Sequence, residues 1–419
     1  MSMAFKVIKR KEDSDTSETK LVVDFLNIDT AVVNSIRRVI LSEIPNVAIA
    51  FDPYSEELSD IQFMKNTSSL HNEFMGHRIS LIPVLVQPEK IPEYDPKKYR
   101  FVIDVHNQGT DIIDVTTDDI KVMDESNEHN EKMHGILFPK NSITKDPILI
   151  TQLKPNLYNK EHGEHLHVEF KSRVGKAKDH ARYSPVSTCT YYNVVDDAAA
   201  DEALKELIAQ QEAKAKDGHV MTKAEKEALK KRFNVHERYR FFKKNEYDEP
   251  NAMRFTIESE CRMTPVYLVD KAIDILIEKC MRLVEDTENA LNVKVIDEET
   301  NAFAVTIYNE DHTLGNLLQS LIYNARIRDN DGKLAYIGYY HPHPLVHEIV
   351  IKLIFNGNAA IRSEDLAQEY FLESIQECVV KKLNEIKKTW RATVVDVVEA
   401  PVVTRIKARG TRTKNDKPR

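Results

Sequence analysis

The chain has 419 residues, a formal net charge of −8, and a composition that is 42% hydrophobic and 30% charged. This length predicts two or three domains, and the composition is typical of a folded globular protein, which excludes a disordered or membrane-embedded class. The negative charge argues against nucleic-acid binding by the whole surface. No apolar run approaches the roughly 20 residues of a membrane span, and the first residues lack the apolar stretch of a secretory signal, so we expect an intracellular protein.

The first predicted helix follows a short strand near the N-terminus. Residues 21–26 are rich in β-branched and aromatic side chains, which is typical of a strand. Asp29 or Thr30 is suited to cap the helix, because a short polar side chain accepts the free N–H groups of the first turn, and Pro45 ends it. Between them the apolar residues recur at helical spacing: Val32, Val33, Ile36, Val39 and Ile40.

Two insertions are predicted after this helix. Residues from about 48 to 171 contain β-like runs bounded by turn residues. Residues from about 196 to 248 are highly charged with helical propensity, and Thr222 is the predicted cap of their second helix. The apolar stripe of this second insertion is thin, so we expect a solvent-exposed arm, with a partner-binding surface as the alternative.

The first segment is repeated in the second half of the chain. Residues 308–322 align with residues 26–40 without a gap, and each copy is followed later by another strand and a long amphipathic helix. Neither half can cover its apolar face alone, so we predict an α+β fold with two modules packed as a pseudo-symmetric dimer within one chain. The later strand and helix span 253–258 and about 266–288 in the first copy, and 347–354 and about 363–391 in the second.

The repeated helices are the predicted contact between the modules. Gly315 costs its helix about 1 kcal/mol relative to alanine, so it predicts a close approach by a neighbouring backbone, with the first helix as the obvious neighbour. The predicted contact residues are Val33, Ile36, Ile40, Leu314, Gly315, Leu317, Leu318 and Leu321.

Several motifs resemble one known family. Residues 34–45 (NSIRRVILSEIP) and 69–83 (SLHNEFMGHRISLIP) resemble the larger alpha-like subunit of archaeal and eukaryotic RNA polymerases, and residues 178–187 look like its return into the dimerisation domain. Residues 311–318 and 338–351 resemble the smaller alpha-like subunit. In the family these are separate chains that heterodimerise, equivalent to the bacterial alpha homodimer. A fusion is similar to what some large DNA viruses encode, so a viral protein packaged in the virion, acting in the host cytoplasm or nucleus, is expected.

The resemblance implies a division of the chain into modules. Residues 1–47 and 172–290 are the expected first dimerisation module, and residues 291–400 the second. The β-rich domain of residues 48–171 and the charged helical insertion of residues 196–248 interrupt the first module, and residues 401–419 form a basic tail.

The resemblance also implies a non-catalytic role. The chain is expected to act as an assembly platform that docks the largest and second-largest polymerase subunits, with small assembly subunits as further partners and DNA contacted only indirectly. Arginine forks suit bidentate contacts with carboxylates, and the family's matching basic pair helps to hold the large subunits. The expected docking residues are Asn34, Arg37, Arg38, Glu43, His71, Glu73, His77 and Arg78, while His343 and His347 are assigned to the contact between the modules.

Two other classes of function are weaker alternatives. A metal enzyme would use the histidines near residues 162–167 or 341–347, but period-two spacing supplies only two converging ligands. The four cysteines include no C-x-x-C pair and none lies within 48–171, so the zinc or iron–sulfur site of some family members, and any other cofactor, is expected to be absent. A nucleic-acid-binding protein would use the tail, where seven basic residues of 405–419 face one acid, Asp416. No catalytic motif is found in the sequence.

Overall fold

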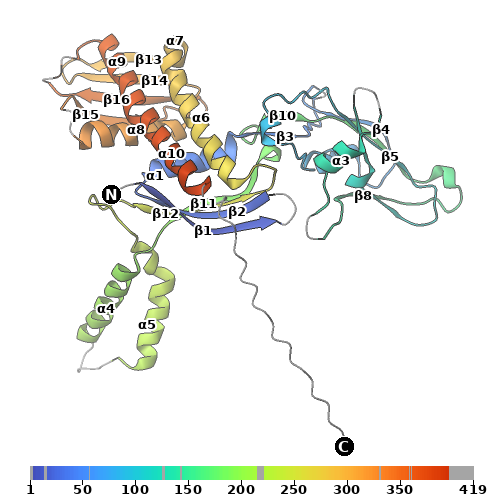
Figure 1. The fold of residues 1–419 in the computed structure, drawn as a ribbon, viewed down its shortest axis with the longest axis horizontal. Coiled ribbons are helices and arrows are strands. Elements are labelled where there is room, and N and C mark those ends of the chain that lie inside the picture. The colour runs from blue at the N-terminus through green and yellow to red at the C-terminus, as the bar shows by residue number, and fades with distance from the viewer. Residues whose placement is uncertain are drawn as a thin grey trace, which may run out of the picture.

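The computed structural model describes residues 3–13, 17–55, 57–124, 128–141, 144–214, 221–329, 332–357, 359 and 361–395. Its fold is α+β, as predicted, with two modules built on four-stranded antiparallel sheets (Figure 1). The predicted basic tail of residues 401–419 lies outside the described residues. In the described part, no helix is long and apolar enough to cross a membrane.

The two modules have the same strand order. The sheet of the first module runs β1 (Ala4–Asp13), β2 (Ser17–Leu26), β12 (Ala252–Ser259), β11 (Val186–Asn193). The sheet of the second runs β13 (Leu291–Asp297), β14 (Ala302–Tyr308), β16 (Glu348–Phe355), β15 (Leu334–Tyr340). Each outer strand therefore has an equivalent in the other module, and the sequence repeat is only one part of a longer structural repeat.

Equivalent helices follow equivalent strands. In the first module β2 leads into α1 (Thr30–Ser42) and β12 into α6 (Pro265–Glu285), which continues into α7 (Thr287–Ala290). In the second module β14 leads into α8 (His312–Ile322), which ends in the π-helical turn η7 (Tyr323–Arg328). The helix predicted over 363–391 is interrupted, because the π-helical segment η8 (Ile375–Val380) separates α9 (Glu364–Ser374) from α10 (Lys381–Val395).

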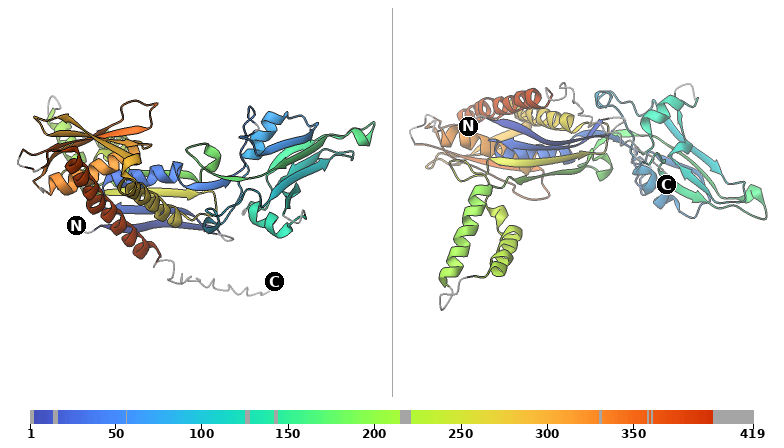
Figure 2. Two further views of the ribbon diagram at one scale, coloured as in Figure 1. Left: turned by 90° about the horizontal axis from the view of Figure 1, so that it is seen from above. Right: turned by 60° about the horizontal axis from the view of Figure 1, so that its bottom comes forward.

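The last helix joins the modules into one core. α10 packs on β1 and α6 of the first module (Figure 2, left). Trp390, the only tryptophan of the chain, is fully buried there. Its ring lies 5.1 Å from that of Phe5 and 6.0 Å from that of Phe25, between ring centroids. The indole therefore ties the C-terminal helix of one module to the sheet of the other.

The first insertion leaves α1 and returns before β11. The pair β3 (Pro45–Ala48) and β10 (Arg173–Lys176) forms its stem. A four-stranded sheet is built from β4 (Ile61–Asn66), β9 (His165–Phe170), β5 (Arg100–His106) and β7 (Ile120–Met123), beside the pair β6 (Ile113–Thr116) and β8 (Leu149–Leu153). Its helical segments are α2 (Asn72–Ser80), α3 (Glu131–Leu137), η1 (Pro88–Lys90), η2 (Thr117–Asp119), η3 (Lys160–His162) and, after the stem, η4 (Ala181–Tyr183).

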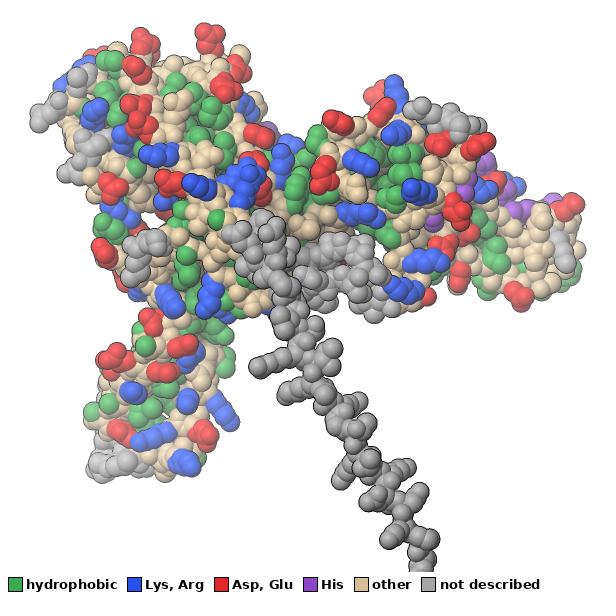
Figure 3. Space-filling view, in the orientation of Figure 1, with side chains coloured by type: hydrophobic (Ala, Val, Ile, Leu, Met, Phe, Trp, Pro, Cys, Tyr) green, Lys and Arg blue, Asp and Glu red, His purple; other side chains and the backbone are tan. Residues whose placement is uncertain are grey.

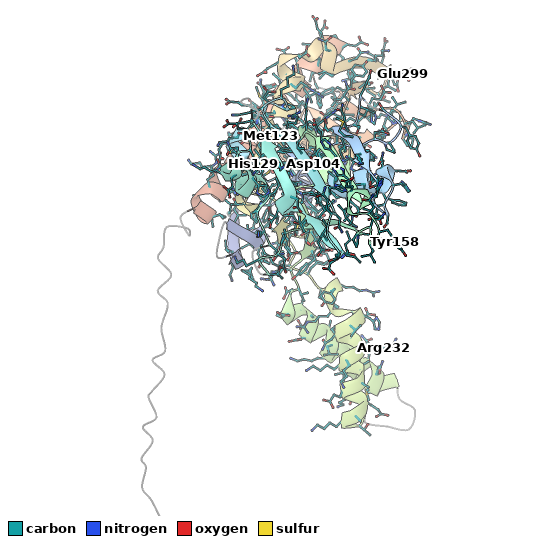
Figure 4. The ribbon with its side chains drawn as sticks, turned by 90° about the vertical axis from the view of Figure 1, so that its right-hand side faces the viewer. Asp104, Met123, His129, Tyr158, Arg232 and Glu299 are labelled. Carbon is teal, nitrogen blue, oxygen red and sulfur yellow. The ribbon has the colours of Figure 1, made fainter. Side chains whose placement is uncertain are left out.

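The second insertion is a helical arm between β11 and β12. α4 (Asp197–Lys214) and α5 (Lys223–His236) form a hairpin that projects from the body, with Arg232 far from the sheets (Figure 4); η6 (Arg238–Arg240) follows. Thr222 caps α5 through a capping box with Glu225, as predicted. The arm carries acidic and basic side chains along its visible face (Figure 3). The second module has only residues 341–347 at the equivalent place, so the arm is an elaboration of a short loop.

Candidate functional site: the contact between the modules

The helices α1 and α8 form the centre of the contact between the modules. Their apolar stripes are buried in one cluster, so the structure brings together these residues of the predicted contact: Val33, Ile36, Ile40, Leu314, Leu317, Leu318 and Leu321. Burying side chains of this kind contributes about 1.5–3 kcal/mol each. The buried apolar side chains therefore contribute strongly to the contact between the modules.

Two aspartates related by the repeat fix the ends of this helix pair. Asp311 caps α8 by accepting a hydrogen bond from the Thr313 N–H at 2.8 Å, and Arg38 of α1 donates to the Thr313 hydroxyl at 2.8 Å and to Asp311 at 3.4 Å. Burial opposes ionisation of Asp311, but the hydrogen bonds of Thr313 and the charge of Arg38 outweigh it and lower its pKa.

At the other end the same arrangement uses neutral partners. Asp29 caps α1 through the Ala31 N–H at 2.7 Å, and it accepts hydrogen bonds from the Ser320 hydroxyl at 2.7 Å and the Asn324 amide at 2.8 Å, both from the second module. Residue 320 is the repeat equivalent of residue 38. The contact is thus isologous, as in a two-fold symmetric dimer.

A buried ion-pair network lies beside the Asp311 end. Lys279 of α6 bonds to Glu43 at 2.8 Å and to Glu310 at 2.9 Å, and Arg282 reaches Glu310 at 2.8 Å. Burial raises the pKa of Glu310. Burial opposes the charge of Lys279, but Glu310 and Glu43 outweigh it and raise the pKa of Lys279. Two carboxylates and two cations from both modules therefore neutralise one another.

Sequence reasoning missed Lys279 and Glu310. One signal was available: Glu310 aligns with Ile28 in the repeat, and both side chains are 3% exposed. A carboxylate at a core position of the repeat indicates a buried partner cation, but the identity of that cation requires the tertiary structure.

The predicted docking residues on α1 have different surroundings. Arg37 donates through Nε and Nη2 to the Asn34 side chain at 3.1 and 2.9 Å, and both residues are half-buried on the helix. Arg38 and Glu43, in contrast, are engaged within the chain, as described above. Arg38 was expected to face a large subunit, but its partners in the structure, Thr313 and Asp311, come from the start of α8.

The predicted docking residues on α2 lie together on an exposed face. His71, Glu73, His77 and Arg78 are exposed, and Arg78 donates to the backbone carbonyls of Ile150 and Leu149 at 2.8 and 3.1 Å. Two large apolar side chains on and after the same helix are also exposed, Phe74 at 59% and Leu81 at 66%. An apolar surface rimmed by charged groups is typical of a protein-binding face.

Two expectations about the module contact need correction. A Cβ at Gly315 would lie 2.5 Å from the Tyr339 ring of β15, so an aromatic side chain, and not the backbone of the first helix, fills the space above this glycine. His343 and His347 are exposed on the connection between β15 and β16. This connection ends a hairpin, so neither side chain reaches the α1–α8 contact.

The histidine clusters do not converge. The rings of His106, His165 and His167 stack along the inserted sheet, with centroids 4.8 and 6.5 Å apart, and His165 bonds to Asp104 at 2.7 Å. Within the ranges that the structure describes, no three His, Cys, Asp or Glu residues are grouped so as to hold a metal ion.

Comparison with known proteins gives matches to both modules. Residues 22–280 and 302–389 each match the RNA polymerase Rpb3/Rpb11 dimerisation domain. The chain is similar to subunit RPAC1 of DNA-directed RNA polymerases I and III from Mus musculus, with 25% identity over 68% of this chain and 85% of that protein. It is also similar to DNA-directed RNA polymerase subunit Rpo3 from Thermococcus kodakarensis, with 25% identity over 67% of this chain and 96% of that protein.

These matches cover the strands and helices that build the module contact, and they agree with the repeat in the structure. The chain belongs to the RNA polymerase Rpb3/Rpb11 dimerisation-domain family, and it is a non-catalytic subunit of a DNA-directed RNA polymerase that carries two such domains in one polypeptide.

Proposed function

We propose that this chain is the preassembled platform on which the largest and second-largest polymerase subunits dock. One observation supports this above all. The α1–α8 contact and its ion-pair network are completed by groups from both modules of a single chain. The dimer that the family otherwise forms from two chains is therefore present as soon as this chain folds, and assembly can proceed directly to the large subunits.

Two faces are proposed for docking. The first is the outer side of α1, where Arg37 is held by Asn34 and keeps further N–H groups for a partner carboxylate. The second is the exposed face of α2, with Phe74 and Leu81 as apolar anchors among His71, Glu73 and His77. Small polymerase subunits are proposed to complete the assembly, and DNA is contacted only through the other subunits. A viral source, with packaging in the virion, stays a prediction from the fusion of the two modules.

The test is co-purification of the tagged chain with the large subunits from its native source, followed by mass spectrometry. We expect Arg37→Glu and Phe74→Asp each to reduce recovery of both large subunits by tenfold or more, because each introduces a charge that the partner surface must desolvate. Lys231→Glu, an equal charge reversal on the exposed side of the arm, is the matched control and should keep recovery within twofold.

The outcomes separate the parts of the proposal. Arg38→Glu is not a docking variant, because Arg38 bonds across the module contact and its loss would weaken the fold. Wild-type recovery with both Arg37→Glu and Phe74→Asp would place the docking faces elsewhere. A wild-type chain that recovers no large subunit would overturn the platform role.

A further inference from the structure

A cleft opens between the modules at the Asp29 end of the helix pair. Its volume is about 1130 Å³. Its walls are the start of α1, the loop of residues 244–251 at the base of the arm, the turn η7 and the start of α10. Both π-helical segments contribute residues to it, and such segments are frequent at functional sites.

The cleft is lined by four acidic and three basic residues, and the three basic residues are all engaged in ion pairs. Of its lining residues, Glu249 is paired with Arg328, Lys244 with Asp248, and Lys382 with Glu385. In the part of the chain that the structure describes, no ion pair is formed by three further lining carboxylates: Asp29, Glu246 and Asp329. Glu246 and Asp329 are exposed, so their charges face the solvent of the cleft.

The other end of the helix pair shows which group such a carboxylate binds. There the equivalent aspartate, Asp311, receives Arg38, and Lys279 and Arg282 supply further positive charge beside it. At the Asp29 end the position of Arg38 is held by Ser320, which is neutral. The cation that bonds to Asp311 therefore has no equivalent beside Asp29, at the end where the cleft is open.

The chain itself contains a segment of complementary charge. Residues 405–419 hold Arg405, Lys407, Arg409, Arg412, Lys414, Lys417 and Arg419 against one acid, Asp416. α10 begins at the cleft with Lys382 and ends at Val395, so its end is about 20 Å from the cleft at 1.5 Å per residue. The residues between 395 and 405 span up to about 30 Å when extended, which is enough to bring the first basic residue back.

We propose that the basic C-terminal tail, residues 405–419, binds in this acidic cleft between the two modules of the same chain. The contact is electrostatic, made by lysine and arginine side chains with Glu246, Asp329 and the remaining lone pair on Asp29 Oδ1. Tethering gives the tail a millimolar effective concentration, so individually weak ion pairs suffice. Because the carboxylates are exposed, the contact weakens as salt screens it.

Zero-length carbodiimide cross-linking of the full chain, read by mass spectrometry, tests this directly. The reagent joins a lysine amine to a carboxylate that it contacts. We expect links from Lys407, Lys414 or Lys417 to Glu246, Asp329 or Asp29 at 50 mM salt, and at least a fivefold reduction at 500 mM. Because the reagent does not activate an amide, the readout for Glu246→Gln/Asp329→Asn is the remaining tail links to Asp29 and Glu249, which should fall at least fivefold. This pair of substitutions leaves the cap of α1 intact.

The matched control neutralises two exposed carboxylates of the first insertion, Glu93→Gln/Glu161→Gln, and should leave the links unchanged. A mixture of isotope-labelled and unlabelled chains should give links within one label only; mixed links would show that the tail binds another copy and would overturn the proposal. Tail links spread over the surface without preference would also overturn it. So would an absence of tail links together with steeply salt-dependent, tail-dependent binding of duplex DNA, which would assign the tail to phosphates.

Discussion

The two ends of the α1–α8 contact are related by the repeat, but the capping aspartate has a charged partner at one end and neutral partners at the other. At the Asp311 end, Arg38, Lys279 and Arg282 meet Asp311, Glu43 and Glu310, and the carboxylates Glu43 and Glu310 are buried. At the Asp29 end, a serine and an asparagine satisfy the aspartate, and a cleft opens beside it. The Asp311 end is closed by ion pairs within the chain, whereas the Asp29 end borders an open cleft with exposed carboxylates.

This difference requires two modules of different sequence. In a symmetric homodimer both ends must be identical, because one sequence supplies both. With two modules of different sequence, residues 38 and 320 can differ. One end of the helix pair can then be closed by ion pairs while a cleft stays open at the other end. Substitutions made separately at each end test this difference.

The largest effect is expected from Lys279→Met. The substitution leaves Glu43 and Glu310 buried with only Arg282 as a counter-charge, and removing one partner of a buried ion pair costs about 3–5 kcal/mol. The loss of unfolding free energy is measured by urea unfolding followed by the fluorescence of Trp390. This residue is the only tryptophan and lies between the modules.

Lys271→Met on the same helix is the control, since Lys271 makes a partly exposed pair with Glu278 at 3.6 Å and should cost below about 1 kcal/mol. The triple variant Glu43→Met/Lys279→Met/Glu310→Ile should recover most of the stability, because apolar groups of similar volume replace buried charges well. Equal costs for Lys279→Met and Lys271→Met would show that the network is not buried in solution.

A smaller effect is expected when the repeat-equivalent residues are compared. Arg38→Ala removes the bonds to Thr313 and Asp311 and leaves a half-buried carboxylate without its cation, at a cost of about 1–3 kcal/mol. Ser320→Ala removes one neutral hydrogen bond from Asp29, which keeps Asn324 as a donor, at a cost of about 0.5–1.5 kcal/mol. Thermal unfolding of the two variants compares the stability that each end contributes. A larger loss of stability for Ser320→Ala than for Arg38→Ala would contradict the assignment of the Asp311 end as the more strongly stabilised one.

The helix pair was predictable from the sequence because its signals are local. The apolar spacing of α1 and α8, and the caps Asp29 and Asp311, are properties of short segments, and the gapless alignment related them. The outer strands were missed. β1 carries Lys6, Lys9 and Lys11, and such charges on an edge strand hide the alternation of apolar residues.

The rest of the site depends on contacts between distant residues. Glu43, Lys279 and Glu310 come together only through the tertiary fold, so no local pattern pairs them. Gly315 correctly predicted a close contact, but its partner Tyr339 belongs to β15, whose position could not be predicted from the sequence. The cleft was equally hidden, because its lining residues come from five separate segments of the chain.

The smallest effect is expected at the open end, where a partly exposed pair bridges the modules. Arg328 of η7 donates to both carboxylate oxygens of Glu249, at 3.1 and 2.7 Å, and its guanidinium lies 4.0 Å from the ring centroid of Tyr247. A double-mutant cycle of Arg328→Gln and Glu249→Gln should give a coupling of about 0.2–1 kcal/mol at pH 7.

The pH dependence distinguishes the ion pair from the stacking on Tyr247. The hydrogen bonds from Arg328 and Asn245 lower the pKa of Glu249 from its ordinary value of 4.5. A carboxylate with a lowered pKa stabilises the fold fully above its unfolded pKa and loses that contribution as the pH falls through the folded pKa. The coupling should therefore be constant at neutral pH and vanish in acid, whereas the cost of Arg328→Gln alone should keep the part due to the aromatic ring. A coupling that survives protonation of Glu249 would mean that the pair is held by its hydrogen bonds rather than by opposite charge, and that the open end depends less on charge than the Asp311 end.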